Sequence, residues 1–318
     1  MFAFSLLCFT MNRKNFGYCI ILFLAICFWG LSYVFTKDLL GVVTPIALIF
    51  FRMVISSALL IVVCSLFFRQ RLRDIPRKDW LYLFCLSLFE PFLYFLCETY
   101  SLKFTDPTVV AVIIATIPVF TVFLSFFYFK ERLSGINFAG VFISVIGILV
   151  MLLPKFSDVT FSKWGILLAF CAVIASVGYS FFLKKLDDRY HSVFIVTCQN
   201  TIGVLLFLPL FILFHSPAEI QTQIANLLDP HILLNVTMLA VFCSALAFVF
   251  YVLAMQKLGL AKANTFTNLF PVVTAVFSFS LGYEQLATSK ILGTIIVIVG
   301  ICMVQHIAKQ KSEEVPAH

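Results

Sequence analysis

The chain has 318 residues, of which 62% are hydrophobic and only 12% are charged, and its formal net charge is +7. Because a soluble globular domain is about half apolar and about a quarter charged, these proportions exclude a soluble protein and indicate one that crosses a membrane many times. The basic residues lie in short stretches between apolar runs, so the positive charge indicates membrane topology, and no nucleic-acid partner is expected.

Ten apolar runs follow one another along the chain, each near the roughly 20 residues that a helix needs to cross a bilayer. We expect membrane-spanning helices at residues 16–36, 45–67, 79–101, 107–129, 135–153, 163–185, 191–215, 232–256, 262–283 and 289–308. Residues 1–10 are apolar but too short to span, and because they precede Arg13 and Lys14 they are a poor signal peptide. The sequence leaves open whether translation starts at Met1 or at Met11.

The second half of the chain repeats the first at an offset of 153 residues. Seven identical pairs fall in register, and they are Pro118/Pro271, Thr121/Thr274, Ser125/Ser278, Glu131/Glu284, Leu133/Leu286, Gly140/Gly293 and Gly147/Gly300. This match indicates an internal duplication. We expect an N-terminal segment 1–15, a first repeat 16–156, a second repeat 157–308 and a tail 309–318. Because each repeat has an odd number of spans, the second must insert upside down, as in many secondary transporters.

Lysine and arginine residues lie mainly on one side of the ten expected spans. That side, which includes both termini, carries sixteen of them, whereas the other side carries five and Arg52 lies within a span. Since cytoplasmic loops collect Lys and Arg, we expect both termini in the cytoplasm and the protein in the inner or plasma membrane. The longest connection, residues 216–231, contains neither Lys nor Arg.

Three local patterns in the first repeat resemble the EamA-type branch of the drug/metabolite transporter superfamily. They are Trp29-Gly30-Leu31-Ser32-Tyr33, Pro45 with Arg52, and Lys130-Glu131-Arg132-Leu133 with Gly140 and Gly147. Together with the ten spans and the duplication, the resemblance covers roughly residues 18–306. It implies an all-α membrane protein whose two inverted five-helix repeats enclose a central cavity and transport small metabolites, often amino acids or related compounds, by alternating access. The second repeat has Glu284-Gln285-Leu286 and lacks the arginine of the first.

Ionisable residues inside a membrane span cost about 2.5–3.5 kcal/mol each on insertion scales unless they are paired or hydrated, so they are functional candidates. Glu90, Tyr94 and Glu98 recur at helical spacing and are expected on one face of the third span, looking into the bundle. Glu90 or Glu98 would bind a proton or a cationic group of the substrate. The alternatives are a structural Glu–Arg pair with Arg52, or a position of Glu98 at the membrane interface. Arg52 would hold a substrate carboxylate through its planar fork, or tie its helix to a neighbour.

Neutral polar and aromatic side chains form a second set of candidates for the lining of a cavity. They are Gln199 and Asn200 in the seventh span, Tyr251 in the eighth, Asn264 and Asn268 in the ninth, and Trp29 and Tyr33 in the first. Buried amides and hydroxyls need partners in hydrocarbon, so they face protein or water. They would suit a polar or zwitterionic small molecule. The alternatives are hydrogen bonds between helices and, for Trp29 and Tyr33, aromatic packing.

Prolines and glycines recur at equivalent positions of the two repeats. Pro118 and Pro271 are each expected to bend their helix, either as a hinge or as a static kink. The glycine pairs of the fifth and tenth spans are expected to let those helices pack closely, and the sequence leaves open whether they do so at a homodimer surface. Glu131 and Glu284 are expected at membrane surfaces at opposite ends of the bundle, where each would cap the helix that follows.

These observations favour a secondary transporter that exports small organic metabolites across the cytoplasmic membrane, with a proton as one candidate for the driving ion. A multidrug or organic-cation exporter is the nearest alternative, although the first span has no acidic residue in its core. An intramembrane lipid-modifying enzyme is disfavoured because the histidines are isolated and no HExxH or GxSxG sequence occurs. The cysteines lack metal-binding spacing, so no metal, cofactor or disulfide is expected.

Overall fold

The computed structural model describes residues 13–67, 75–121, 135–152, 162–186, 189–258, 263, 266–283 and 287–313, and within them every regular element is helical. The first repeat contains α2 (Arg13–Leu39), α3 (Pro45–Phe67), α4 (Arg77–Ser87), η2 (Leu88–Leu93), α5 (Tyr94–Phe104), α6 (Pro107–Ile114) and α8 (Gly135–Leu152). The second contains α9 (Lys163–Leu186), α10 (Ser192–Leu213), α11 (Pro217–Leu227), α12 (Pro230–Met238), η4 (Leu239–Leu246), α13 (Ala247–Leu258), η5 (Thr267–Leu269), α15 (Phe270–Ser280) and α16 (Thr288–Glu313).

These helices match the ten predicted spans. Six continuous helical stretches are long and apolar enough to cross a membrane, and they are Phe16–Leu39, Pro45–Phe67, Arg77–Phe104, Lys163–Leu186, Ser192–Leu213 and Pro230–Leu258. Shorter apolar helices occupy Pro107–Thr121, Phe270–Ser280 and Thr288–Gly300, and α8 fills the fifth predicted span. The prediction of an all-α membrane protein with ten spans in two inverted repeats is therefore confirmed.

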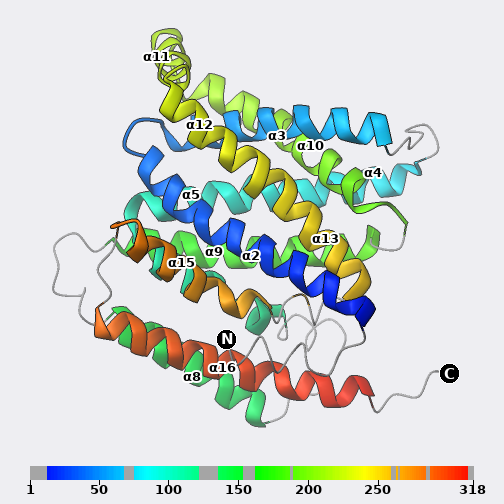
Figure 1. Ribbon diagram of the computed structural model, residues 1–318, viewed down its shortest axis with the longest axis vertical. Coiled ribbons are helices and arrows are strands. Elements are labelled where there is room, and N and C mark those ends of the chain that lie inside the picture. The colour runs from blue at the N-terminus through cyan, green and yellow to red at the C-terminus, as the bar shows by residue number, and fades with distance from the viewer. Residues whose placement is uncertain are drawn as a thin grey trace.

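Successive spans run back and forth, so their connections gather at two ends of the bundle (Figure 1). At the end that we call the α11 end, on the left of Figure 1, α2 turns into α3, α5 turns into α6, and α16 begins. At the other end, which we call the Asp79 end, α4 begins and α9 turns into α10. A solute that crosses the bundle must pass both ends.

α8 and α16 pack against each other along one edge of the bundle (Figure 1). A β-carbon at Gly147 would lie 2.7 Å from the amide nitrogen of Val297, and one at Gly300 would lie 2.6 Å from the carbonyl oxygen of Gly140. The two backbones are thus in direct contact, which needs residues without a side chain. The glycines therefore pack the fifth span on the tenth, as their spacing predicts.

The two repeats interlock and do not form two separate halves. α3 packs on α10, α5 packs on α9, and α2 packs on both α13 and α15, so each contact joins one helix from each repeat. Because these contacts surround the centre of the bundle, both repeats bound any space that lies there.

The repeat also relates two irregular segments in the middle of the third and eighth spans. η2 contains a kink between two helices and η4 is π-helical, and adding the offset of 153 to residues 88–93 gives 241–246, which fall inside η4. π-Helical turns are rare and occur frequently at functional sites. In η2 the backbone of Glu90 is extended (φ −145°, ψ 117°), next to Pro91, which has no amide hydrogen for a helical hydrogen bond. The third span therefore bends at the buried carboxylate of Glu90.

Pro118 and Pro271 each follow an interruption of their helix. α6 ends at Ile114, and a turn at residues 115–116 precedes the short helical stretch that contains Pro118. The 3-10 turn η5 precedes α15, and Pro271 lies in the first turn of that helix, where proline is well tolerated. A hinge role for either proline stays a prediction.

Residues 216–231, which the sequence analysis treats as a plain connection, contain the helix α11. Ser216 and Glu219 form a capping box, in which Ser216 Oγ accepts a hydrogen bond from the Glu219 amide at 3.3 Å and the Glu219 carboxylate accepts one from the Ser216 amide at 2.7 Å. The hydrogen bonds from Ser216 lower the pKa of Glu219. Serine followed three residues later by glutamate is a signature of a helix start, so the sequence held the signal for this helix.

Candidate functional site

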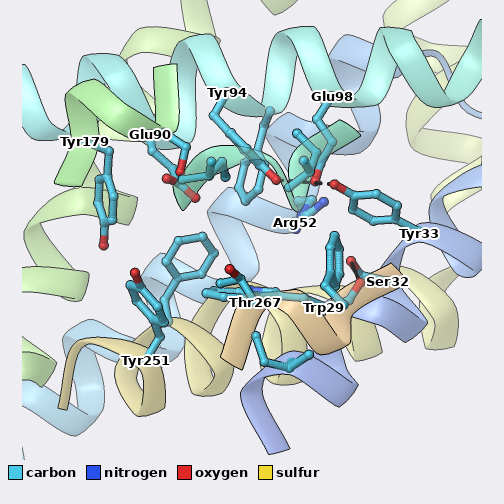
Figure 2. Close-up of a pocket in the computed structure, with 17 residues that line it drawn as sticks. Trp29, Ser32, Tyr33, Arg52, Glu90, Tyr94, Glu98, Tyr179, Tyr251 and Thr267 are labelled. Atoms are coloured by element: carbon cyan, nitrogen blue, oxygen red, sulfur yellow. Dashed lines mark hydrogen bonds between the residues drawn. The ribbon is translucent and has the colours of Figure 1, made fainter. Parts of the chain in front are cut away.

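A cavity of about 60 Å³ lies in the middle of the bundle (Figure 2). Because one water molecule needs about 10–15 Å³, it has room for roughly four to six waters. The polar and charged residues that line it are Trp29, Ser32, Tyr33, Arg52, Glu90, Tyr94, Glu98, Ser176, Tyr179, Tyr251 and Thr267. Both repeats contribute to the lining, as the interlocked packing requires.

Glu90 enters the cavity from the bend in the third span. The residue is only 6% exposed, and its carboxylate forms a hydrogen bond with Ser176 of α9. Figure 2 shows Glu90 at one end of the cavity with Tyr179 and Tyr251. In the part of the chain that the structure describes, no basic side chain forms an ion pair with Glu90. The structural pairing with Arg52 that the sequence left open therefore does not involve Glu90.

Glu98 lies at the opposite end of the cavity from Glu90 and interacts with more polar side chains than Glu90 does (Figure 2). Its carboxylate accepts hydrogen bonds from the hydroxyls of Tyr33 and Tyr94, whose oxygens lie 3.3 Å from each other. It also interacts electrostatically with the Arg52 guanidinium. Glu98 is 5% exposed and faces the cavity, so it does not lie on the outer surface of the bundle.

Arg52 is among the largest fully buried side chains of the protein. Its Nε donates a hydrogen bond to Ser244 Oγ on η4 at 2.8 Å, and its Cζ lies 4.2 Å from the centre of the Phe95 ring. Arg52 thus ties α3 to neighbouring helices, and it also lines the cavity. With Glu90 and Glu98, the described residues that line the cavity include two carboxylates and one guanidinium.

Aromatic rings form much of the remaining wall. The Trp29 ring lies 5.1 Å from that of Phe248 and 5.3 Å from that of Tyr251, and the Tyr33 ring lies 4.9 Å from that of Phe270. The Trp29 indole also donates a hydrogen bond to a backbone carbonyl of η4 at 3.2 Å. Trp29 and Tyr33 therefore pack against other rings and line the cavity at the same time. Aromatic faces attract cations, so this wall suits an ammonium group.

Gln199 and Asn200 lie between helices and are not among the lining residues. Asn200 Nδ2 donates hydrogen bonds to the Ser244 carbonyl at 2.9 Å and to Ser56 Oγ at 3.2 Å. Gln199 Oε1 accepts one from the Tyr179 hydroxyl at 3.4 Å. Both amides join neighbouring spans, which is the alternative that the sequence left open for them.

Several candidates in the ninth span and the loops fall outside the structural description. Asn264, Glu131 and Glu284 lie outside the described residues. Asn268 lies in η5, where only its backbone is described.

Ser176 and Tyr179 of α9 line the cavity although the sequence analysis did not select them. A signal was present, because Val177-Gly178-Tyr179-Ser180 resembles Trp29-Gly30-Leu31-Ser32-Tyr33 at the matching place in the other repeat. A β-carbon at Gly178 would lie 2.5 Å from the Phe89 ring, so the glycine lets α9 approach η2 and brings Tyr179 close to Glu90. In this way the duplication predicts a cavity-lining role for the sixth span.

Residues 15–153 and 163–305 each match the model of the EamA-like transporter family. The chain belongs to this family. It is 25% identical over 285 residues to an "Uncharacterized transporter" of Archaeoglobus fulgidus, covering 90% of this chain and 97% of that protein. It is 24% identical over 274 residues to the "Uncharacterized transporter YcxC" of Bacillus subtilis, covering 86% of this chain and 87% of that protein.

A chain of known crystal structure shares the fold of this EamA-family protein. Its TM-score is 0.66 at 19% sequence identity, and the match covers 94% of this chain and 100% of that chain. Family membership makes the protein a multi-pass membrane transporter. The cavity between the two EamA repeats is therefore the candidate site for its substrate.

Proposed function

We propose that this EamA-family transporter exports small, amino-acid-like metabolites that carry an amine, moving them across the cytoplasmic membrane by alternating access. The observation that carries the proposal is the charge balance of the cavity, where Glu90 and Glu98 face the single guanidinium of Arg52. When both carboxylates are ionised, the site needs one more positive charge to be neutral. A proton or the ammonium group of a substrate supplies that charge.

Glu90 is the group that receives this charge. Glu98 interacts electrostatically with Arg52, whereas no basic side chain among the described residues interacts in this way with Glu90. An ammonium ion beside Glu90 would lie against Tyr179 and Tyr251, whose ring faces attract cations. A carboxylate on the same substrate would be attracted to the guanidinium at the other end of the cavity. The site thus offers complementary groups to both ends of an amino acid.

Competition at Glu90 gives a way to drive export. A proton and the ammonium group of a substrate cannot both neutralise the Glu90 carboxylate, so the substrate leaves the site in exchange for a proton. An inward proton gradient would then favour outward movement of the amine. The Lys/Arg distribution supports this sidedness, with both termini in the cytoplasm and the α11 end outside.

The test is transport by purified protein in proteoliposomes with an imposed pH gradient. Glu90→Gln removes the charge and keeps the size of the side chain, so pH-driven accumulation should fall by at least about tenfold, as expected when a charge-assisted contact worth at least about 1.4 kcal/mol is lost. Glu219→Gln on the exposed helix α11 is the matched control and should transport like the parent. Undiminished pH-driven accumulation by Glu90→Gln would overturn the proposed role of Glu90.

A second candidate function is the export of organic cations, and the aromatic wall around Trp29, Phe248 and Tyr251 favours it. A panel of radiolabelled amino acids, nucleosides and quaternary amines in export assays separates the two. Preference for quaternary amines over amino acids would select the cation exporter, and the reverse preference the amino-acid-like substrate. Transport of nucleosides alone would contradict both.

A further inference from the structure

We infer that two hydrogen-bonded contacts, one at each end of the bundle, are the gates of the transport cycle. One joins Lys37 to the end of α5 at the α11 end, and the other joins Gln256 to Tyr190 at the Asp79 end. This inference rests on the alternating access of the proposed function, but it does not depend on which substrate is carried.

The first gate caps a helix end with a charged side chain. Lys37, in the last turn of α2, donates hydrogen bonds from Nζ to the carbonyls of Leu102 at 2.6 Å and Thr105 at 3.1 Å. The last carbonyls of a helix lack intrahelical partners and carry partial negative charge, which a lysine stabilises. One turn from Lys37, Tyr33 contacts Tyr94 of α5 inside the cavity. The first gate therefore closes the cavity directly beyond its lining residues.

The second gate is the counterpart of the first in the other repeat. Gln256 Nε2, near the end of α13, donates a hydrogen bond to the Tyr190 carbonyl at 3.0 Å, in the turn after α9. The offset of 153 maps Lys103 of α5 onto Gln256 of α13, and the Lys103 carbonyl lies 3.5 Å from Lys37 Nζ. Each gate therefore lies at the same end of an equivalent helix, α5 or α13, and because the repeats are inverted, the two contacts lie at opposite ends of the bundle.

These contacts join the two walls of the cavity. α2 and α13 pack on each other and form one wall, where Trp29 meets Tyr251. α5 and α9 pack on each other and form the facing wall, which carries Glu98 and Tyr179. The first gate links α2 to α5 and the second links α9 to α13, so each joins one wall to the other. Opening one gate while the other stays closed exposes the cavity to one side only.

The ion pair at the Asp79 end has a different role. Asp79 of α4 accepts hydrogen bonds from Arg189 at 2.7 Å and from the Tyr190 hydroxyl at 2.8 Å. α4 and α9 pack on each other in the same wall, so this pair stiffens a wall and leaves the passage unaffected. Burial and the neighbouring Asp79 raise the pKa of Tyr190 to about 12, so its hydroxyl stays a donor near neutral pH.

The two gates differ in strength, because the donor of the first is a charged lysine and the donor of the second is a neutral glutamine amide. Charge-assisted hydrogen bonds are roughly twice as strong as neutral ones. We therefore expect the α11 end to be closed more often than the Asp79 end in the absence of substrate.

The test is the labelling of a cavity cysteine from either side. Ser32→Cys places a thiol in the cavity of a protein whose native cysteines have been replaced, reconstituted in vesicles of known orientation. A charged, membrane-impermeant methanethiosulfonate is added to one face at a time, and no substrate is present. The rate of labelling from each face reports how often that end is open.

Lys37→Met removes the first gate and should raise labelling from the α11 face by about tenfold, while labelling from the other face falls. Gln256→Met removes the second gate and should raise labelling from the Asp79 face by about threefold, while labelling from the α11 face falls. Lys103→Met, which removes an exposed lysine at the same end as Lys37, is the matched control and should change neither rate. Lys37→Arg should restore the parent rates, and Lys37→Gln, which keeps a donor, should give a smaller shift than Lys37→Met.

Two results would contradict the inference that these two contacts are gates. One is labelling of the parent from both faces that none of the Lys37 and Gln256 variants alters. The other is a labelling rate from one face that changes in the same direction in Lys37→Met and in Gln256→Met. Labelling from a single face in every variant would contradict alternating access itself, and the proposed function would fall with the gates.

Discussion

Glu98 and Glu90 lie on the same span, and both are almost fully buried, yet their surroundings differ in kind. Glu98 interacts electrostatically with Arg52 and accepts hydrogen bonds from the hydroxyls of Tyr33 and Tyr94. Glu90 has a hydrogen bond with Ser176 and no basic partner among the described residues. The comparison teaches that burial of a carboxylate in a membrane protein does not by itself indicate its role. A balanced carboxylate stabilises the fold, whereas an unbalanced one is available for a proton or a ligand.

The largest expected effect comes from removing the cation that balances Glu98. Arg52→Met leaves that carboxylate buried without its partner, so the free energy of unfolding should fall by about 3–5 kcal/mol. Chemical unfolding of the purified protein in detergent micelles measures this. The double variant with Glu98→Gln should recover much of the loss, because the two residues act as one unit. A double variant as unstable as Arg52→Met would mean that Glu98 is not balanced by Arg52.

The next effect separates the two acids directly. Glu98→Gln leaves the Arg52 guanidinium without its counter-charge and should lower the free energy of unfolding by about 3 kcal/mol. Glu90→Gln removes a charge that has no counter-charge, so the free energy of unfolding should stay within about 1 kcal/mol of the parent. The same unfolding measurement compares them. Equal losses in the two variants would remove the distinction between the two ends of the cavity.

A smaller effect is expected from the tyrosines at the two ends. Tyr94→Phe removes a hydrogen bond to a charged group and should lower the free energy of unfolding by about 1.5–3 kcal/mol. Tyr179→Phe is its counterpart near Glu90 and removes a long, neutral hydrogen bond to Gln199, so about 0.5–1 kcal/mol is expected. The thermal unfolding of both variants should be followed under one set of conditions. A larger loss of unfolding free energy in Tyr179→Phe than in Tyr94→Phe would contradict the stronger hydrogen bonding assigned to the Glu98 end.

The smallest effect lies outside the membrane, at an acid that is neither buried nor in the cavity. The pKa of Glu219 is lowered by hydrogen bonds from Ser216, so its contribution to α11 is present above the unfolded-state pKa of about 4.3 and is lost as pH falls through the lower folded-state value. Hydrogen exchange of the α11 amides at about pH 7 and about pH 3 should show this loss in the parent. In Glu219→Gln the protection should be lower at neutral pH and should no longer depend on pH.

The sequence predicted the fold well because its signals are long and repeated. Ten apolar runs and a duplication with an odd number of spans determine the architecture without any knowledge of side-chain contacts. Glu90, Glu98 and Arg52 were found because charge is rare in hydrocarbon. The sequence could not predict which carboxylate interacts with Arg52. The placement of Glu90 and Glu98 on one face assumed regular helical spacing, and the extended backbone at Glu90 breaks that spacing. The helix α11 was missed although its capping box was visible at Ser216.

The central claim is that Glu90 carries one unbalanced negative charge for which a proton and a cationic substrate compete. The most direct measurement is the pH dependence of tetramethylammonium binding to the purified protein by calorimetry, because this cation keeps its charge at every pH. Competition predicts that the dissociation constant falls by up to about tenfold per pH unit as pH rises, and that this dependence disappears in Glu90→Gln. A dissociation constant that is independent of pH in the parent, or a dependence that persists in Glu90→Gln, would contradict the account.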